Sequence, residues 1–275
     1  MNTPRLILAE DGIFPIVWDA AGNKLPQLPA SGFDFPGTIQ GEGKLNGVPS
    51  LFIRLSGCNL HCVWKQPDGS LSECDTAYAS YRVRHSVSLS IEEISQIVYH
   101  NTTHLKHIVI TGGEPFLQAK SLKQLCIKLK QIKDYHITVE TNATIFDEEL
   151  AGYIDFFSLS PKLSASAPAA PYTELHENKR MQPSIIQCFI THSLQYHKSF
   201  QLKFVCSGKQ DIEEIQHLLS QLQGWKNEDI LLMPLGADPM ALQQNIRQVL
   251  EYCIRNDWRY CNRLHLSLFG NKTGV

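Results

Sequence analysis

Three cysteines lie within one polar, turn-rich stretch, CNLHCVWKQPDGSLSECDT, which spans residues 58–76. Three residues separate Cys58 from Cys62, and eleven separate Cys62 from Cys74. Thiolate sulfur is a soft ligand that suits zinc or an iron–sulfur cluster. Structural zinc needs four closed ligands, whereas three thiolates without a fourth suit a 4Fe-4S cluster that leaves one iron open. The spacing predicts a metal centre and leaves its type open.

The other five cysteines do not form a second cluster. Each is isolated in a predicted helix, strand or connection, and each is better explained as a small buried hydrophobic residue: Cys126, Cys188, Cys206, Cys253 and Cys261. A fourth ligand for zinc would have to come from a nearby histidine, such as His61 or His85.

The composition is that of an ordinary globular protein. Of the 275 residues, 43% are hydrophobic and 19% are charged, and the formal net charge is -2. The chain lacks the basic excess of a nucleic-acid binder, and no apolar run is long enough for a membrane span or a signal peptide. We therefore expect a cytoplasmic protein without membrane or nucleic-acid partners, where clustered cysteines are more often ligands than disulfides.

A second motif, TGGEPFLQ at residues 111–118, directly follows the strand-like HIVIT. Glycine allows close approach of the backbone to a ligand, and Glu114 offers a carboxylate for an ammonium group. A Gly-Gly turn before proline is common in loops, so the motif gains weight from its position after a buried strand and downstream of the cysteines.

Strands and helices alternate through most of the chain. Strands are predicted at 51–55, 107–111, 136–141, 155–160, 201–206, 229–235 and 264–269, and helices at 90–101, 119–132, 181–194, 211–223 and 239–256. Short apolar strands separated by helices favour parallel pairing. The pattern predicts an α/β domain spanning residues 1–275, with a full or partial (β/α) barrel favoured over a doubly wound open sheet.

Two segments are expected to lie outside this core. Residues 1–34 contain a predicted hairpin around Ala21-Gly22-Asn23 and form an accessory β extension. Residues 164–180, rich in alanine, serine and proline, are expected to form a long loop that covers a site.

The cysteine loop and the GGEP motif together resemble the radical S-adenosylmethionine enzymes, whose cluster loop reads C-x3-C-x2-C. Here residues 65–73 lengthen the second gap, and their turn signal, Pro67-Asp68-Gly69, predicts a hairpin that returns Cys74 to the cluster. TIQGEG (38–43), SPK (160–162) and the final FGNKTGV narrow the resemblance to the 7-carboxy-7-deazaguanine synthase family, over residues from about 35 to the C-terminus.

The resemblance implies roles for individual residues. The 4Fe-4S cluster would be bound by Cys58, Cys62 and Cys74, and Mg²⁺ by Thr76. The residues that would contact S-adenosylmethionine are Gly113, Glu114, Ser160, Pro161, Lys162, Met233, Pro234, Leu235 and Gly236. The residues that would contact the substrate are Ile39, Gln40, Gly41, Glu42, Arg54, Thr111 and the C-terminal Val275.

The implied reaction converts 6-carboxy-5,6,7,8-tetrahydropterin into 7-carboxy-7-deazaguanine and ammonia in 7-deazapurine (queuosine) biosynthesis, through a 5'-deoxyadenosyl radical. The resemblance also implies a homodimer and a reducing partner such as flavodoxin. From its position alone, the 65–73 insertion is expected to form a flap near the cluster or to dock the electron donor. Three positions depart from the family pattern: Ala143 after ETN, the MPLGA segment, and FGNK near the end.

Two other functions agree with parts of the sequence. A radical S-adenosylmethionine activase of a partner protein would share the cluster loop and GGEP but would not need Gln40, Arg54 and Thr76. A zinc-stabilised binding module would need only the cysteines and a further ligand.

Overall fold

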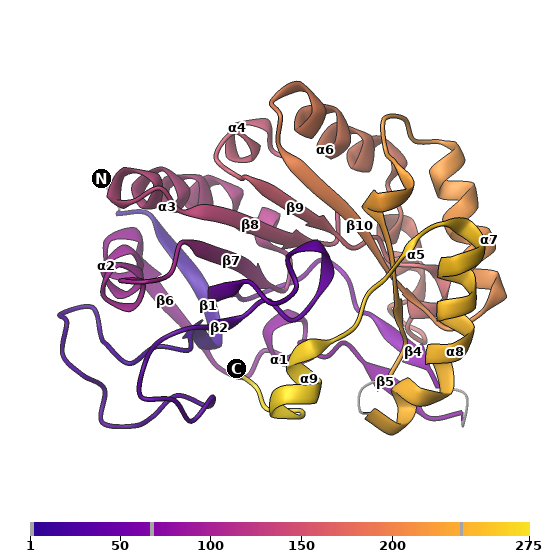
Figure 1. The fold of residues 1–275 in the computed structure, drawn as a ribbon. Coiled ribbons are helices and arrows are strands. Elements are labelled where there is room, and N and C mark those ends of the chain that lie inside the picture. Colours follow the sequence, from indigo (N-terminus) through magenta and orange to yellow (C-terminus); the bar gives the residue numbers. More distant parts are fainter. Residues whose placement is uncertain (1–2, 67–68, 237–238) are drawn as a thin grey trace.

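The main sheet is curved into an arc (Figure 1). A computed structural model describes residues 3–66, 69–236 and 239–275, with only the backbone for residues 239–244. Within this part of the chain the sheet has ten strands. Their order is β12 (Arg259–Tyr260), β11 (Ile230–Pro234), β10 (Ser199–Cys206), β9 (Phe156–Leu159), β8 (His136–Thr141), β7 (His107–Gly112), β3 (Pro49–Leu55), β1 (Arg5–Phe14) and β6 (Ser86–Ser90), with β2 (Thr38–Ile39) paired to β3.

The winding of the sheet is that of a barrel. From β3 to β11 every neighbouring pair is parallel, and the strands follow chain order without a reversal. A doubly wound sheet reverses its order at a switch point, so that alternative is wrong. The described strands end at β6 and β12 without pairing to each other, so the expected barrel is a partial one.

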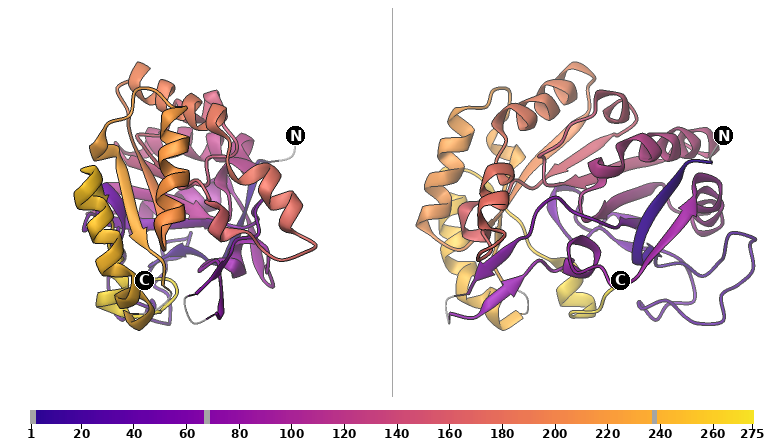
Figure 2. Two further views of the ribbon diagram at one scale, coloured as in Figure 1. Left: turned by 90° about the vertical axis from the view of Figure 1, so that its right-hand side faces the viewer. Right: turned by 180° about the vertical axis from the view of Figure 1, so that it is seen from behind.

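Helices connect the parallel strands and lie along the outer side of the arc, as the views from both sides show (Figures 1 and 2). They are α2 (Ile91–Asn101), α3 (Ala119–Ile132), α4 (Glu148–Ala151), α6 (Pro183–Gln195), α7 (Lys209–Ser220) and α8 (Pro239–Asn256). Short 3-10 turns occur at Gly43–Leu45, Pro115–Gln118, Ser164–Ser166 and Asn227–Asp229. The helices predicted near 90–101, 119–132, 181–194, 211–223 and 239–256 are confirmed.

The helix sequences explain their packing. In α3 the apolar side chains recur every three or four residues, so they form one stripe that is buried against the sheet: Leu122, Leu125, Cys126 and Leu129. Helix α2 begins with a capping box, in which the Ser90 hydroxyl accepts from Glu93 N and the Glu93 carboxylate accepts from Ser90 N. These local signals made the helices predictable.

The N-terminal segment contributes to the main sheet. Strand β1 pairs antiparallel with β3 and β6, and its Leu6 and Leu8 are fully buried. The expected hairpin around residues 21–23 is reduced to a turn with one bridge between Trp18 and Lys24. Neither β1 nor β6 was predicted, because RLIL is a short apolar run and SVSLS is a polar edge strand.

The strand predicted at 264–269 is wrong, because these residues form α9 (Leu264–Phe269). LHLSLF alternates apolar and polar residues, which is typical of a strand. In the folded chain the Leu264 amide instead donates to the carbonyl of Gly41, 2.9 Å away, which fixes the segment against the turn after β2. A tertiary contact therefore overrides the local pattern.

The long loop expected at 164–180 is also only partly correct. Its second half is the helix α5 (Thr173–Arg180), which contains good helix formers in TELHENKR. Arg180 fixes this helix to the core by donating to Glu214 and to the carbonyl of Lys162.

The open side of the arc carries the hairpin β4 (Val63–Lys65) and β5 (Leu71–Glu73), the short α1 (Ala77–Ser80), and α9 (Figure 1). The hairpin expected from the 65–73 insertion is therefore confirmed, although Pro67 and Asp68 of its turn lie outside the described residues. Among the described helices, none is both long and apolar enough to cross a membrane.

Candidate active site

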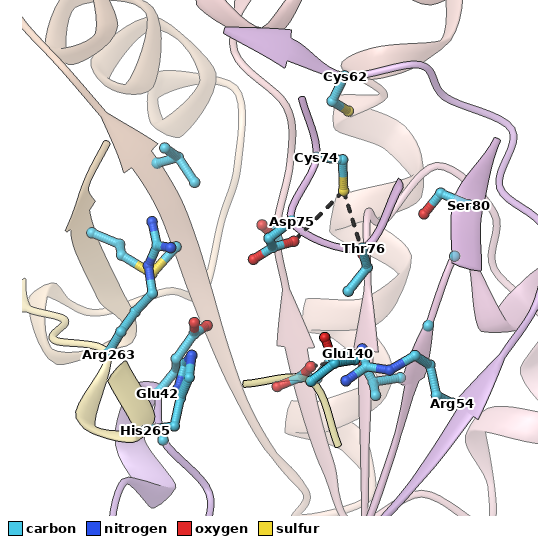
Figure 3. Close-up of a pocket in the computed structure, with 18 of the residues that line it drawn as sticks. Glu42, Arg54, Cys62, Cys74, Asp75, Thr76, Ser80, Glu140, Arg263 and His265 are labelled. Carbon is cyan, nitrogen blue, oxygen red and sulfur yellow. Dashed lines mark hydrogen bonds between the residues drawn. The ribbon is translucent and has the colours of Figure 1, made fainter. Parts of the chain in front are cut away.

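A cavity of about 490 Å³ opens at the carboxyl ends of the parallel strands. It brings together segments that are far apart in the sequence, from Phe14 at the end of β1 to the C-terminus. The predicted site residues all line it except Glu114, Pro161 and Pro234. Figure 3 shows Cys62 and Cys74 at one end of the cavity and Arg54 and Glu140 at another.

Backbone hydrogen bonds shape the cysteine loop. Directly after β3, the amide of Cys58 donates to the carbonyl of Ser80, 3.0 Å away. The amide of Cys74 donates to the carbonyl of Cys62, 3.1 Å away, at the base of the β4–β5 hairpin. Tyr81 Oη donates to the same Cys62 carbonyl, at 2.9 Å. The insertion thus leaves the core as a hairpin and returns Cys74 beside Cys62, as its turn signal predicted.

The environment of the three thiols suits a cluster. Cys62 packs in an apolar group with Leu60 and Leu235, and Cys58 and Cys74 lie against it. Burial raises the pKa of Cys58 to about 11 and also raises the pKa of Cys62 and Cys74, so bound iron would have to displace their protons.

The three thiols are one ligand short of the four that a closed structural zinc site needs. Within the described ranges, no three His, Cys, Asp or Glu side chains are arranged to hold one metal ion. The donor set is three soft sulfurs lining one cavity, which fits a larger 4Fe-4S cluster with one iron left without a protein ligand.

The GGEP motif packs directly against the cysteine loop. A Cβ on Gly113 would lie 2.0 Å from the carbonyl oxygen of Gly57, so only glycine allows the two loops to meet. Glu114 lies behind the cavity wall, where its carboxylate accepts from the Asn142 amide at 2.7 Å, the Thr141 hydroxyl at 2.8 Å and the Phe116 amide at 3.0 Å. Burial raises its pKa, and these hydrogen bonds oppose that rise. In this structure Glu114 therefore organises the loop after β8.

That loop contains one of the departures from the family pattern. Ala143, where glycine is usual, has a φ of 59° and is 1% exposed. This left-handed conformation costs an L-residue about 1 kcal/mol, and the chain accepts it while keeping the turn. The turn that the substitution put in question is present.

Two further groups of predicted residues line the cavity near the cysteines. Lys162 Nζ donates to Ser160 Oγ, 2.8 Å away, just after β9. Met233 near the end of β11, and Leu235 and Gly236 just after it, line the neighbouring wall. Pro161 and Pro234 are buried beside them without lining the cavity.

Thr76 occupies the position before α1 but does not cap it, because its side chain makes no capping hydrogen bond. Its hydroxyl lies 3.4 Å from Cys74 Sγ and faces the cavity (Figure 3). Because the Thr76 hydroxyl is not used as a helix cap, it remains an oxygen donor beside the cysteines.

Glu140 is a cavity residue that the sequence did not predict. It faces inward from β8, where it accepts from Thr111 Oγ1 at 2.7 Å and from Gln40 Nε2 at 3.1 Å. A carboxylate near the carboxyl end of a largely buried strand is the signal that could have identified it. Glu140 thus joins two predicted substrate-contacting residues.

Glu42 faces a different set of partners than expected. Lys203, inward-facing on β10, donates to its carboxylate, and Arg263 and His265 lie close by (Figure 3). Burial would raise the pKa of Glu42, but the neighbouring positive charges outweigh burial and lower it to about 2. The charges of Glu42 and Glu140 in turn raise the pKa of Lys203, against the effect of burial. Lys203, Arg263 and His265 were not predicted, and Glu42 is already bound within the protein.

The C-terminal segment closes one side of the cavity. Residues 270–275, including Val275, line it together with His265 and Leu266 of α9. A Cβ on Gly41 would lie 2.2 Å from His265 Nδ1, so the glycine of TIQGEG lets α9 pack against this turn. Gly270, Asn271 and Lys272 of FGNK therefore form part of the wall, although this segment departs from the family pattern.

Comparison with known proteins shows which enzyme family has a similar sequence and a similar cysteine loop. Residues 52–162 match the family model described as the radical SAM superfamily. A 7-carboxy-7-deazaguanine synthase from Halobacterium salinarum is 32% identical over 263 residues, which cover 91% of this chain and 93% of that protein. The synthase of the same name from Rhodopirellula baltica is 33% identical, with 86% of this chain and 85% of that protein covered.

Solved structures support the same fold. The crystal structure of QueE from Escherichia coli matches with a TM-score of 0.58 and 23% identity, covering 92% of this chain and 95% of that one. A more distant match is the histidine-tagged anSMEcpe with bound AdoMet, at a TM-score of 0.50 and 16% identity, covering 76% of this chain and 62% of that one.

Proposed function

Because the chain belongs to the 7-carboxy-7-deazaguanine synthase family of radical S-adenosylmethionine enzymes, we propose that it converts 6-carboxy-5,6,7,8-tetrahydropterin into 7-carboxy-7-deazaguanine and ammonia. The observation that supports this most is that three cysteines, Arg54 and Glu140 surround one cavity. These residues unite a cluster loop with charged groups suited to a small polar substrate.

The enzyme uses a 4Fe-4S cluster and S-adenosylmethionine, as its superfamily does. When bound, they supply the one-electron chemistry that starts the ring contraction. Cys58, Cys62 and Cys74 would hold the cluster. Lys162 and the end of β11 would line S-adenosylmethionine, with Gly113 keeping the two loops in contact.

The remaining cavity residues match the chemistry of a carboxylated pterin. Arg54 presents a guanidinium that can bind the carboxylate, and Thr76 offers an oxygen ligand for a Mg²⁺ ion shared with the substrate. One edge of the pterin ring carries several hydrogen-bond donors. Glu140 and Gln40 line the cavity side by side, where their oxygens could accept from these donors. Glu42 would act indirectly, because Lys203 already binds its carboxylate.

Three broader features belong to the same proposal. A small electron-donor protein such as flavodoxin would reduce the cluster, and the chain would function as a homodimer, as the resemblance implies. It would do so in the cytoplasm, as expected from the sequence. Residues 1–275 would act as one catalytic unit, which the membership of β1 in the main sheet supports.

The direct test is to incubate the anaerobically reconstituted, reduced protein with S-adenosylmethionine, Mg²⁺ and 6-carboxytetrahydropterin, and to identify the product by mass spectrometry. We expect 7-carboxy-7-deazaguanine, with S-adenosylmethionine recovered rather than consumed. If the protein cleaves S-adenosylmethionine but leaves the pterin unchanged, it is an activase-like enzyme and the proposed substrate is wrong.

The Glu140→Gln variant tests the assignment of the ring edge. Replacing the carboxylate removes one acceptor oxygen and the negative charge that Gln40 and Thr111 face. We expect KM for the pterin to rise roughly 10- to 100-fold, the range that one charged hydrogen bond contributes. The exposed Glu148→Gln on α4 is the matched control and should leave KM unchanged. An unaltered KM in Glu140→Gln would place the ring elsewhere.

A further inference from the structure

The N-terminal strand places an acidic residue, Asp11, directly behind two residues that line the cavity, Arg54 and Tyr78. Strand β1 pairs regularly with β6 up to Ala9, but its register against β3 shifts between Leu8 and Ile13. In this irregular part Gly12 has a φ of +50°, a conformation that favours glycine. The bulge turns the preceding Asp11 side chain toward β3 and α1, where the sheet alone would not place it.

Asp11 meets Arg54 and Tyr78 there. One carboxylate oxygen, Oδ2, accepts from Arg54 Nε at 2.7 Å and from Tyr78 Oη at 2.8 Å. The Arg54 and Asp11 side chains are only 13% and 12% exposed, so water screens the pair weakly. Burial would lower the pKa of Arg54, but the Asp11 carboxylate reverses the direction and raises it.

Two aromatic rings hold the same guanidinium. Its central carbon lies 4.8 Å from the centroid of Phe14 and 5.9 Å from that of Tyr78. Phe14 is itself stacked on Phe52, with centroids 5.4 Å apart. Asp11 therefore binds the Nε edge of the Arg54 guanidinium, and the rings of Phe14 and Tyr78 pack against this group. Among the described residues, no hydrogen bond engages the two terminal nitrogens of Arg54, which lines the cavity.

We propose that Asp11 is a positioning residue for substrate recognition: it fixes the Nε edge of Arg54 so that the terminal nitrogens face the carboxylate of the bound pterin. This inference rests on the proposed function, in which Arg54 binds that carboxylate. It assigns a role in the site to residues 11–14, a segment that the sequence alone marked as accessory. Arginine binds carboxylates best through two parallel hydrogen bonds, so its orientation decides how well it discriminates.

A purely structural ion pair would behave differently. Such a pair stabilises the fold, and its loss would weaken the binding of every ligand to a similar extent. A positioning residue affects only ligands that carry the group to which Arg54 is directed. The second oxygen of Asp11, Oδ1, is buried without a partner, so the pair is not optimised for stability alone. The two roles are therefore separable by comparing ligands with and without a carboxylate.

The experiment measures equilibrium binding of 6-carboxypterin and of unsubstituted pterin by fluorescence. The probe protein is the reconstituted enzyme with S-adenosylmethionine and Mg²⁺, under anaerobic conditions. The readout is the ratio of the two affinities, which is the preference for a carboxylate. Asp11→Ala is expected to lower this preference roughly tenfold, the value of one charge-assisted hydrogen bond, while the affinity for pterin stays within about twofold. Asp11→Asn keeps an oxygen acceptor for Arg54 Nε and should retain most of the preference.

Further variants separate the possible failures. Arg54→Met should abolish most of the preference; if it does not, or if the wild type shows none, the assignment of Arg54 in the proposed function is wrong and the inference falls with it. If Arg54→Met loses the preference but Asp11→Ala keeps it, only the role of Asp11 is overturned.

An equal loss of the affinities for 6-carboxypterin and for pterin in Asp11→Ala also overturns that role. This is the result expected if the ion pair only stabilises the fold. Should Asp11→Ala fail to fold, Tyr78→Phe and Asp11→Asn decide. Tyr78→Phe removes one of the two donors to Asp11 Oδ2 but keeps the Arg54 contact, so it should alter the carboxylate preference by less than twofold. A tenfold loss of the preference in Asp11→Asn contradicts positioning.

Discussion

Replacing Lys203 by methionine is expected to lower the melting temperature of the protein by roughly 10 °C. Lys203 is the buried partner of Glu42, with side chains 8% and 15% exposed. Removing one member of a buried ion pair leaves the other charge uncompensated, at a cost of about 3–5 kcal/mol. A protein of this size loses about 2–4 °C of Tm per kcal/mol, which gives the expected shift. Thermal unfolding of the purified chain measures it.

The pH dependence of the same variant tests the cause. The folded pKa of Glu42 is about 2, below its ordinary 4.5, so its contribution to stability is present above pH 4.5 and is lost as the pH falls toward 2. Without Lys203 the buried carboxylate should take up a proton more readily than in the wild type. The gap in Tm between the wild type and Lys203→Met should therefore narrow as the pH is lowered.

A matched control is Lys209→Met, which removes a lysine from an exposed pair with Glu213, 3.2 Å apart. An exposed pair of this kind contributes at most about 1 kcal/mol, so Tm should change little. The Tm of Lys203→Met could instead lie within about 2 °C of the wild-type Tm, as expected for the Lys209→Met control. That result would mean that the Glu42–Lys203 pair is not formed in solution. Adding Glu42→Gln to Lys203→Met should restore part of the lost stability, since the unpaired charge is then removed.

Replacing Cys62 by alanine is expected to remove the bound iron and to abolish formation of the deazapurine product. Cys62 is 4% exposed and belongs to the apolar group at the end of the cavity, against which Cys58 and Cys74 pack. A cluster with three protein thiolates has no spare ligand, so the loss of one should empty the site. Iron and labile sulfide analysis after reconstitution, together with product detection, measure both effects.

Cys188→Ala is the control for this loss. Cys188 is exposed on α6, on the outer side of the sheet, and should have no part in the cluster. Its replacement is expected to leave the iron content and turnover at wild-type values. Full iron retention in Cys62→Ala, with the fold intact by circular dichroism, would mean that the three cysteines do not act together.

The parts of the site that are local in the sequence could be predicted from it. Two local features indicated a cluster loop interrupted by a hairpin: the spacing of Cys58, Cys62 and Cys74, and the turn signal between the last two. Both could be predicted because they depend only on neighbouring residues. The GGEP motif was located in the same way, directly after a strand. The apolar strands and amphipathic helices likewise indicated a barrel of parallel strands.

The parts that depend on contacts between distant segments could not be predicted. Glu140 and Lys203 are each one of several polar residues in their strands, and only the register of the sheet makes both face the same cavity. Asp11 depends on a bulge in a strand that the apolar pattern barely indicated. The pairing of Glu42 with Lys203 joins residues 161 positions apart, so no local pattern encodes it.

The C-terminal segment shows the same limit. LHLSLF has the alternation of a strand, yet it forms α9 because Leu264 is bonded to Gly41 and His265 fills the space over that glycine. The strand pattern described the side chains correctly as alternately apolar and polar. It could not indicate which surface would receive them.

The central claim is that three thiols at the mouth of a partial barrel hold a 4Fe-4S cluster with one iron open to S-adenosylmethionine. Electron paramagnetic resonance of the reconstituted, reduced protein, with metal and sulfide analysis of the same sample, tests it most directly. The account predicts about four iron and four sulfide per chain, and a spectrum that changes when S-adenosylmethionine is added. Bound zinc without sulfide, or a cluster spectrum that S-adenosylmethionine leaves unchanged, would contradict it.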